Sequence, residues 1–300
     1  MVTPPDTRSL YKSIDGHARS LTTYDWLIKF ITVPYTSTWV ETPAGLTHVI
    51  CVGREDAPTI VLLHGQGASA PTWNGEINEL AQHYRIFAPD VLASMGKSTP
   101  TRLPRSGTKA GEWLKATLDG LGVTTAHLVG ISNGAWLILK LATVAPEKMK
   151  SATLLSAAGI VPTSLRLMTK AIPFLTVGPF VSPARKTQMF GRMMGVPGKP
   201  MNEQDQAMFT VLLGDFKMEP TPGPLPESEL HCLTAPTQLL IGEHEAAFPA
   251  PNIINRAKAV LPNLVRAEVL PGVGHGMITE DVSLVSNRIS AFVQIVESQS

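Results

Sequence analysis

Short apolar stretches that alternate with longer segments of helical spacing run through most of this sequence. Continuous runs of apolar and β-branched residues are typical of strands buried on both faces, as in parallel sheets. Parallel neighbours need long crossover connections, so helices must cover both faces of such a sheet. The alternation therefore predicts an α/β protein. The expected strands are residues 47–52, 59–64, 84–89, 126–131, 151–157, 237–241 and 266–270, and the expected helices are residues 74–83, 111–121, 135–145, 253–261 and a last one from about 281.

The alternation fails between Gly159 and about Ala235, where the pattern is helical or irregular. Strands resume beyond this segment, so we interpret it as a helical cap inserted between two strands. The predicted core then comprises residues 1–158 and 236–300, and the cap residues 159–235. Residues 160–235 hold 10 of the 25 prolines and 7 of the 11 methionines. Rigid turns with adaptable side chains suit a cover over an apolar substrate, although an ordinary packed layer would share this composition.

Charge and cysteine content exclude several classes of protein. The chain has 25 Lys and Arg residues against 24 Asp and Glu residues, a formal net charge of +1. This balance argues against a nucleic-acid partner and against a polybasic membrane-surface protein, because both need clustered positive charge. Two cysteines are too few for a disulfide framework or a four-thiolate zinc site, and no two histidines have metal-ligand spacing. We therefore expect no metal.

The sequence shows no targeting or membrane-spanning segment. Residues 1–6 lack the charged and apolar regions of a secretory signal peptide. The most apolar stretch, about residues 165–181, is interrupted by a lysine and two prolines and is too short to span a bilayer. We expect a soluble cytoplasmic protein without stable membrane insertion. The oligomeric state is not predicted.

The segment Gly130-Ile131-Ser132-Asn133-Gly134 matches the G-x-S-x-G pattern of a nucleophile elbow. It follows an expected strand and opens an expected helix, which is the context that an elbow requires. The helix N-terminus directs its dipole at any oxyanion formed beside the serine. The pattern makes Ser132 a candidate nucleophile, with an ordinary glycine-rich turn as the alternative.

A serine nucleophile needs a base that is oriented by a third group. His275 lies in a glycine-rich loop after the last expected strand, where a flexible backbone lets the imidazole reach a neighbouring strand end. The loop after the preceding strand carries three candidates for the third group. These candidates are Glu243, His244 and Glu245.

The loop of residues 64–69 allows two interpretations. In an acyl-transfer enzyme, a backbone N–H of this loop joins that of Asn133 in an oxyanion hole. The segment from Gly65 also matches G-x-G-x-x-A, and Asp90 ends the next strand about twenty residues later, as in dinucleotide-binding sites. Pro71 delays the helix that would face a pyrophosphate. An NAD(P)-dependent oxidoreductase is therefore the weaker alternative.

With these residues in place, the chain resembles the α/β-hydrolase superfamily over about residues 38–296. Within it, the chain is similar to bacterial carboxylesterases of the kind that cleave aryl-propionate esters. The resemblance implies the α/β-hydrolase fold, a mostly parallel sheet with helices on both faces and a helical cap between strands. The segments that carry it are His64-Gly65, Asp90 with Gly96-Lys97-Ser98, the Ser132 elbow, Gly242-x-x-Glu245, Gly274-His275, and residues 47–50 and 239–245.

The resemblance also implies the roles of the triad residues. By it, Ser132 is the nucleophile, His275 the general base and Glu245 the acid that orients the base. The acid position usually carries aspartate in this superfamily. Because this chain has glutamate there, Glu243 stays open as an alternative acid.

By the same resemblance, the backbone amides of Gln66 and Asn133 form the oxyanion hole. We expect Gly65, Gly67 and Met277 to contact the substrate. The implied function is a cofactor-independent serine esterase that cleaves small hydrophobic esters through an acyl-enzyme. Hydrolases of C–C bonds, lactones or thioesters with the same fold, and a hydrolase-fold binding protein without turnover, stay open as alternatives.

Overall fold

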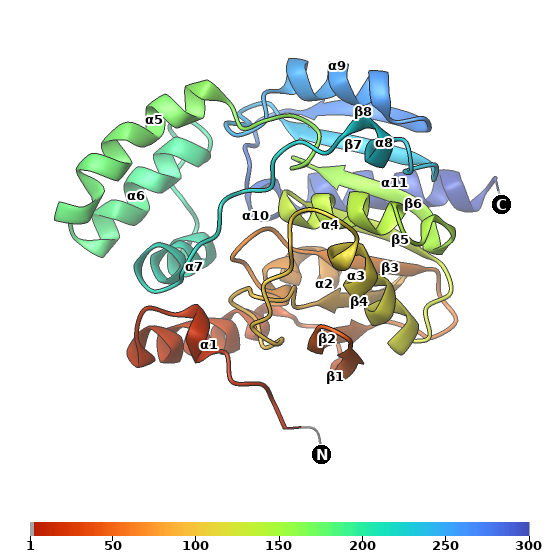
Figure 1. Cartoon of the computed structure of the whole chain (residues 1–300), viewed down its shortest axis with the longest axis horizontal. Helices are drawn as coiled ribbons and strands as arrows, with labels where there is room; N and C mark the ends of the chain where they lie inside the picture. The colour runs from red at the N-terminus through yellow and green to blue at the C-terminus, as the bar shows by residue number, and fades with distance from the viewer. Residues whose placement is uncertain (1–2, 300) are drawn as a thin grey trace.

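The computed structural model describes residues 3–299. Its centre is an eight-stranded sheet of order β1-β2-β4-β3-β5-β6-β7-β8 (Figure 1). Strands β3 to β8 run parallel, whereas β2 is antiparallel to both of its neighbours. This is the mostly parallel sheet that the sequence predicts. The strands are β1 (Tyr35–Thr42), β2 (Gly45–Val52), β3 (Thr59–Leu63), β4 (Arg85–Pro89), β5 (Ala126–Ile131), β6 (Met149–Leu155), β7 (Thr237–Gly242) and β8 (Leu264–Leu270).

Helices cover both faces of the sheet, as predicted. On one face α3, α4 and α9 contribute to a large apolar cluster, and on the other α2, α10 and α11 contribute to a second. The central strand β5 is buried along its whole length, and its side chains alternate between the two clusters. These helices are α2 (Asn74–Leu80), α3 (Lys109–Gly120), α4 (Asn133–Ala142), α9 (Ala250–Val260), α10 (Met277–Glu280) and α11 (Val282–Glu297).

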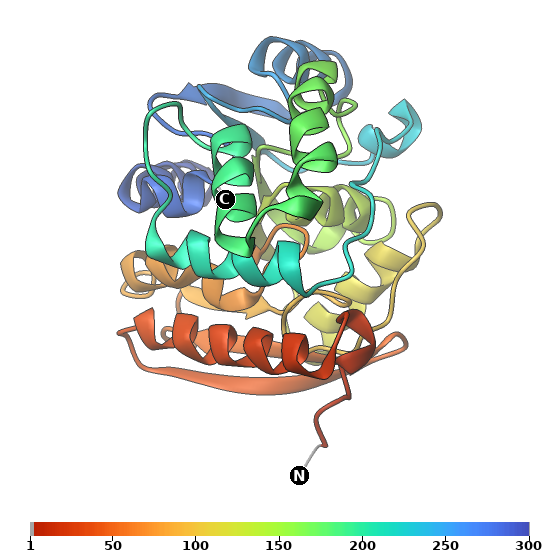
Figure 2. The ribbon, with the colours of Figure 1, turned by 90° about the vertical axis from the view of Figure 1, so that its left-hand side faces the viewer.

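Three helices between β6 and β7 stand over one end of the sheet and form the cap (Figures 1 and 2). They are α5 (Leu165–Thr176), α6 (Pro183–Met194) and α7 (Glu203–Gly214). The segments on either side of them pack with the core. Val161 before the helices, and Leu230 in the short helix α8 (Glu227–Leu230) after them, are buried in the same cluster as α4.

Near the N-terminus, one strand was not predicted from the sequence, and the helix before it contacts the cap. Strand β1 is an edge strand with mostly exposed side chains, so it lacks the apolar run that identifies the other strands. Helix α1 (Ile14–Leu27) lies beside the cap helix α7, and Figure 2 shows the two helices on the same side of the molecule. Arg19 of α1 and Asp215 just after α7 form an ion pair of 2.6 Å. The N-terminal segment thus supports the cap.

Short 3-10 turns complete the secondary structure. Within residues 3–299, no helix has both the length and the apolar character that crossing a bilayer requires. The turns are η1 (Arg8–Leu10), η2 (Ile28–Phe30), η3 (Ala70–Trp73), η4 (Pro146–Lys148) and η5 (Gly178–Phe180).

Candidate active site

Ser132 occupies a strained turn between β5 and α4. Its backbone angles are φ 53° and ψ −111°, a region that residues other than glycine rarely adopt. The Ser132 N–H donates to the Leu155 carbonyl over 2.9 Å, which fixes the turn to the neighbouring strand β6. A Cβ at Gly134 would overlap the Leu63 carbonyl, so the elbow needs glycine there. The predicted strand–turn–helix context of Ser132 is therefore present.

His275 and Glu245 come from the loops that follow β8 and β7 and form a hydrogen-bonded pair. The His275 Nδ1 lies 2.9 Å from Glu245 Oε2 and 3.0 Å from Oε1. The Glu245 side chain is 1% exposed and the His275 side chain 20% exposed. With Nδ1–H donating to the carboxylate, Nε2 is left to accept a proton. Ser132 and His275 line the same cavity, and the described residues show no direct hydrogen bond between them, as is common before substrate binds.

The two acidic candidates of the β7 loop lie in different surroundings. Glu245 Oε1 accepts hydrogen bonds from the backbone N–H groups of Ala247 at 2.6 Å and Phe248 at 3.2 Å. The Glu243 side chain is 54% exposed, and its carboxylate accepts from the Gly272 N–H at 2.9 Å. The structure therefore brings Glu245, rather than Glu243, to His275.

The pair shifts the pKa values of both partners. Burial alone would raise the pKa of Glu245, yet the charge and hydrogen bond of His275 outweigh it and lower that pKa. Burial alone would lower the pKa of His275, yet Glu245 outweighs it and raises that pKa above its ordinary value. The buried Ser156 hydroxyl makes no hydrogen bond of ordinary geometry, but it lies close enough to Glu245 to help lower the pKa of that carboxylate.

The raised pKa of His275 predicts a pH profile for any reaction in which it serves as base. The base must be neutral, so kcat/KM should rise with pH. The midpoint of this rise should lie above about pH 6.5. Glu245→Gln removes the charge that raises the pKa of His275, so the acidic limb should move to lower pH. Profiles of both proteins on a p-nitrophenyl ester between about pH 5 and about pH 9 test this. A limb at the same pH in both proteins would contradict it.

The predicted oxyanion donors lie at neighbouring strand ends. Gln66 follows β3, and Asn133 is the first residue of α4. Neither backbone N–H finds an acceptor among the described residues. Gly65 lies against the nucleophile, because a Cβ on it would be 3.8 Å from the Ser132 Cβ. Both N–H groups are therefore available to a ligand beside Ser132.

Side-chain contacts that the sequence did not predict hold these two residues. The Gln66 Nε2 donates to the Glu219 carbonyl over 2.6 Å. Arg105 donates to the Asn133 Oδ1 over 3.0 Å and to the Pro220 carbonyl over 3.2 Å. The guanidinium also lies over the Trp136 ring, 5.3 Å from its centroid. Arg105 lies in an irregular loop without periodicity, so no sequence pattern pointed to it.

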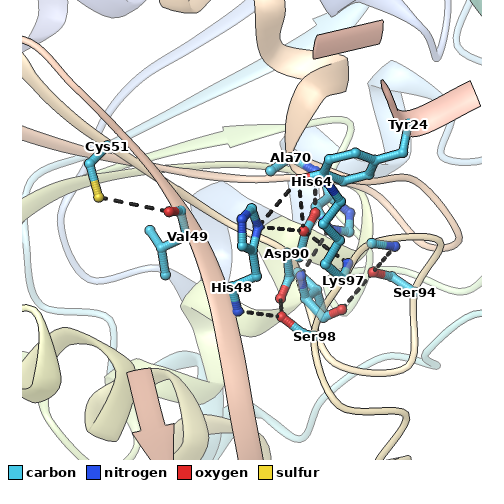
Figure 3. Close-up of polar contacts among 12 residues, drawn as sticks. Tyr24, His48, Val49, Cys51, His64, Ala70, Asp90, Ser94, Lys97 and Ser98 are labelled. Carbon is cyan, nitrogen blue, oxygen red and sulfur yellow. Dashed lines mark hydrogen bonds and ion pairs between the residues drawn. The ribbon is translucent and has the colours of Figure 1, made fainter. Parts of the chain in front are cut away.

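A buried polar network anchors the loop that carries Gln66 (Figure 3). The carboxylate of Asp90 is at its centre and is fully buried. It accepts hydrogen bonds from the Ala70 N–H at 2.8 Å, the Lys97 N–H at 3.0 Å and the Tyr24 hydroxyl at 3.0 Å. His48 Nδ1 lies 3.0 Å from the same group. Both oxygens of Asp90 are thus occupied and out of reach of a ribose, so the structure does not support the dinucleotide alternative.

A cavity of about 550 Å³ separates the cap from Ser132 and His275. Its volume is within the range of small-molecule sites. Most of its lining is apolar and comes from the cap, as the abundance of methionine there suggested. The methionine and phenylalanine side chains that line it are Met168, Met193, Met194, Met201, Met208, Met218, Phe190, Phe209 and Phe248.

One end of the cavity is polar and joins the cap to α10. Asp205 of α7 accepts hydrogen bonds from the Thr279 hydroxyl at 2.8 Å and from the Asn202 amide at 3.0 Å. Burial raises the pKa of Asp205 to about 6, and the nearby Glu280 carboxylate adds to this effect. Because α10 follows directly after His275, these contacts connect the cap to the segment that carries the histidine.

The three predicted substrate contacts have different outcomes. Gly65 lines the cavity, whereas Gly67 lines a small neighbouring pocket that Arg105 and Asn133 also line. The prediction for Met277 needs correction. Met277 is fully buried and belongs, with Trp73, to the apolar cluster on the face of the sheet that α2, α10 and α11 cover. As the first residue of α10 it turns its apolar side chain into the core, while residues 276 and 278 line the cavity.

The residues gathered here suit acid–base and nucleophilic chemistry. Among residues 3–299, no group of three or more His, Cys, Asp or Glu side chains is assembled as a metal site would require.

Comparisons with known proteins agree with this architecture. Residues 58–188 match a family model described as the alpha/beta hydrolase fold. The chain is 28% identical to an uncharacterized carboxylesterase, nap, of Bacillus subtilis, with 93% of each chain covered. It is 27% identical to the carboxylesterase YbfK of the same organism, over 94% of this chain and 96% of that one. The crystal structure of the Bacillus subtilis naproxen esterase matches with a TM-score of 0.81 at 27% identity, over 94% of this chain and 99% of that one.

Proposed function

We propose that this chain, a member of the α/β-hydrolase superfamily, is a serine carboxylesterase that hydrolyses small, neutral, hydrophobic esters. One observation carries the proposal: a serine on a strained elbow shares an apolar cavity with a histidine that is hydrogen-bonded to a buried glutamate side chain. Relatives that are named carboxylesterases and cover more than nine-tenths of the chain support ester hydrolysis as the reaction class.

The first half of the proposed reaction acylates the serine. The Ser132 Oγ attacks the ester carbonyl carbon while His275 Nε2 accepts the hydroxyl proton. The carbonyl oxygen becomes an oxyanion, which accepts hydrogen bonds from the N–H groups of Gln66 and Asn133. The tetrahedral intermediate then expels the alcohol oxygen, which takes the proton from His275 as it leaves.

The second half releases the acid. A water molecule gives a proton to His275 and attacks the acyl carbon, and the intermediate collapses with return of that proton to Ser132. In both halves the Glu245 carboxylate stabilises the imidazolium that forms and holds its orientation. Each oxyanion donor contributes about 3–4 kcal/mol to transition-state stabilisation in enzymes of this kind.

The cavity supports a neutral, apolar substrate. Burial of aromatic or aliphatic groups against the methionine and phenylalanine side chains of the cap favours binding by roughly 25 cal/mol per Å² of apolar surface. At its polar end the lining holds two acidic residues, Asp205 and Glu280, against the basic residue Lys199, so a carboxylate on the substrate would meet an excess of acidic groups. We therefore expect the enzyme to discriminate against anionic esters.

A substrate panel tests the proposed function. We expect a neutral aryl ester to be hydrolysed with a kcat/KM at least about tenfold above that of its carboxylate-bearing analogue. Thioesters, lactones and a C–C bond substrate complete the panel, with Ser132→Ala as the control for each. Higher kcat/KM for any of these three would shift the assignment to that hydrolase class. Labelling by a fluorophosphonate without turnover of any substrate would favour a binding protein.

A further inference from the structure

The cap carries an exposed apolar surface, most of which lies outside the substrate cavity. Helix α5 presents Leu165, Met168, Ile172 and Leu175 to solvent, and their spacing of three or four residues places them on one face of the helix. Phe180 in η5 continues this surface, and the exposed fractions of Leu165 and Phe180 are 79% and 88%. We refer to these five residues as the outer patch.

The side of α5 next to the outer patch is apolar as well. Leu167 and Ala171 line the cavity over Ser132. The apolar stripe of a helix in a globular protein normally faces a core, so the outer patch lacks the cover that its composition requires. Contiguous exposed apolar surfaces of this kind mark places where a protein meets another surface.

The charge around the outer patch indicates the kind of surface. Residues 160–202 contain six Lys and Arg residues and no Asp or Glu residue. In α6, next to α5, Arg185 is exposed, and so is Arg192 about two helical turns further along. Lys186 lies over the Phe174 ring, with Nζ 5.6 Å from its centroid. The near-zero net charge of the whole chain conceals this local excess of positive charge.

We propose that the outer patch docks on an anionic lipid bilayer, with α5 in the interface plane. Apolar side chains that enter the acyl boundary, together with basic side chains at the headgroup level, are the combination that holds peripheral helices on such membranes. The 12 residues of α5 extend about 18 Å, less than the roughly 30 Å of a bilayer core, so the helix lies on the membrane rather than across it. Figure 2 shows the cap helices together on one side of the molecule.

A second copy of the chain suits this surface less well. A two-fold contact through the outer patch would bring the basic side chains of both copies together, and like charges across an interface oppose association. Anionic headgroups neutralise the same charges. Met168 connects the outer patch with the cavity, because its side chain is more than half exposed and also lines the cavity. An apolar ester dissolved in the bilayer would meet the cavity at this residue.

Flotation with lipid vesicles tests the proposal without any enzymatic turnover. At about 0.1 M salt the wild type should float with vesicles of phosphatidylglycerol and phosphatidylcholine, and far less with phosphatidylcholine alone. Raising the salt to about 0.5 M should weaken the binding, because screening reduces the attraction of exposed charges. Leu175→Ser with Phe180→Ser should lower the vesicle partition coefficient at least about tenfold.

The matched control is Ile295→Ser on α11, which removes an exposed apolar side chain of 43% exposure far from the cap. This control should float like the wild type. Neither Leu175 nor Phe180 lines the cavity, so the double variant should keep its turnover of a water-soluble ester, which also shows that it folds. Absence of wild-type flotation on anionic vesicles would overturn the proposal. So would a lipid-free dimer that the double variant dissociates, because the patch would then be a subunit interface.

Discussion

Replacing Ser132 by alanine should lower kcat for p-nitrophenyl esters by about 10⁴- to 10⁶-fold. The Ser132 hydroxyl is the only protein group in the proposed mechanism that forms a covalent bond to the substrate. Without it, the cavity and the oxyanion donors retain only the modest acceleration that binding and electrostatics give to attack by water. Steady-state kinetics with purified protein measure the loss. The variant should also resist labelling by a fluorophosphonate that labels the wild type at this serine.

The control for this substitution is a measurement of the unfolding temperature, which shows whether the variant still folds. Alanine occupies φ 53° with much the same strain as serine, and the bond from the backbone N–H of residue 132 to the Leu155 carbonyl persists. The unfolding temperature should therefore stay within about 2–4 °C of the wild-type value. A folded Ser132→Ala protein that keeps most of its turnover would contradict the assignment of the nucleophile.

The second large effect distinguishes the two glutamates of the β7 loop. Glu245→Gln should lower kcat by about 10⁴-fold, because the neutral amide neither stabilises the imidazolium nor fixes the tautomer of His275. Glu243→Gln is the matched control, with the same substitution two residues away. Its side chain is 54% exposed, and the amide oxygen can still accept from the Gly272 N–H. We expect less than about tenfold loss there.

Kinetics on both variants, with the same ester and at the same pH, decide between the carboxylates. Equal and mild losses would mean that neither residue is the orienting acid. A larger loss in Glu243→Gln would transfer that role to the more exposed carboxylate. Because Glu245 is buried, its variant needs a thermal unfolding scan as well, so that lost activity is compared between folded proteins.

The fold was predictable because each inner strand of the sheet is buried on both faces. Strand β5, for instance, is an apolar run that ends in a glycine turn, and its predicted bounds are those of the structure. The edge strand β1 was missed for the opposite reason, since its side chains are mostly exposed and leave no apolar run. The support that α1 gives to the cap depends on a contact between residues nearly 200 positions apart in the chain, such as Arg19 and Asp215, which local patterns do not encode.

The candidate site was predictable only where chemistry requires a local pattern. The elbow around Ser132 and the glycine-rich loop around His275 are short signatures, so the sequence located both. Arg105 contacts Asn133 from an irregular loop, and nothing in its neighbours along the chain points to that contact. Met277 was wrongly expected at the cavity, because proximity to His275 in the chain does not fix the direction of a side chain in a helix that starts immediately afterwards. The roles of the triad and oxyanion residues stay predictions until the variants are measured.

The cap forms from one continuous stretch between β6 and β7, which has a consequence for engineering. Such an insertion can be exchanged for that of a relative at two junctions, so substrate preference can be recombined without rebuilding the sheet. Two of the polar contacts between this stretch and the rest of the chain illustrate what a working chimera must preserve. A transplanted cap must supply partners for Thr279 and for Arg19, which Asp205 and Asp215 satisfy in this chain. Chimeras that keep both aspartates would retain these contacts, and those that lose them would lose the Arg19 ion pair and the hydrogen bond between Asp205 and Thr279.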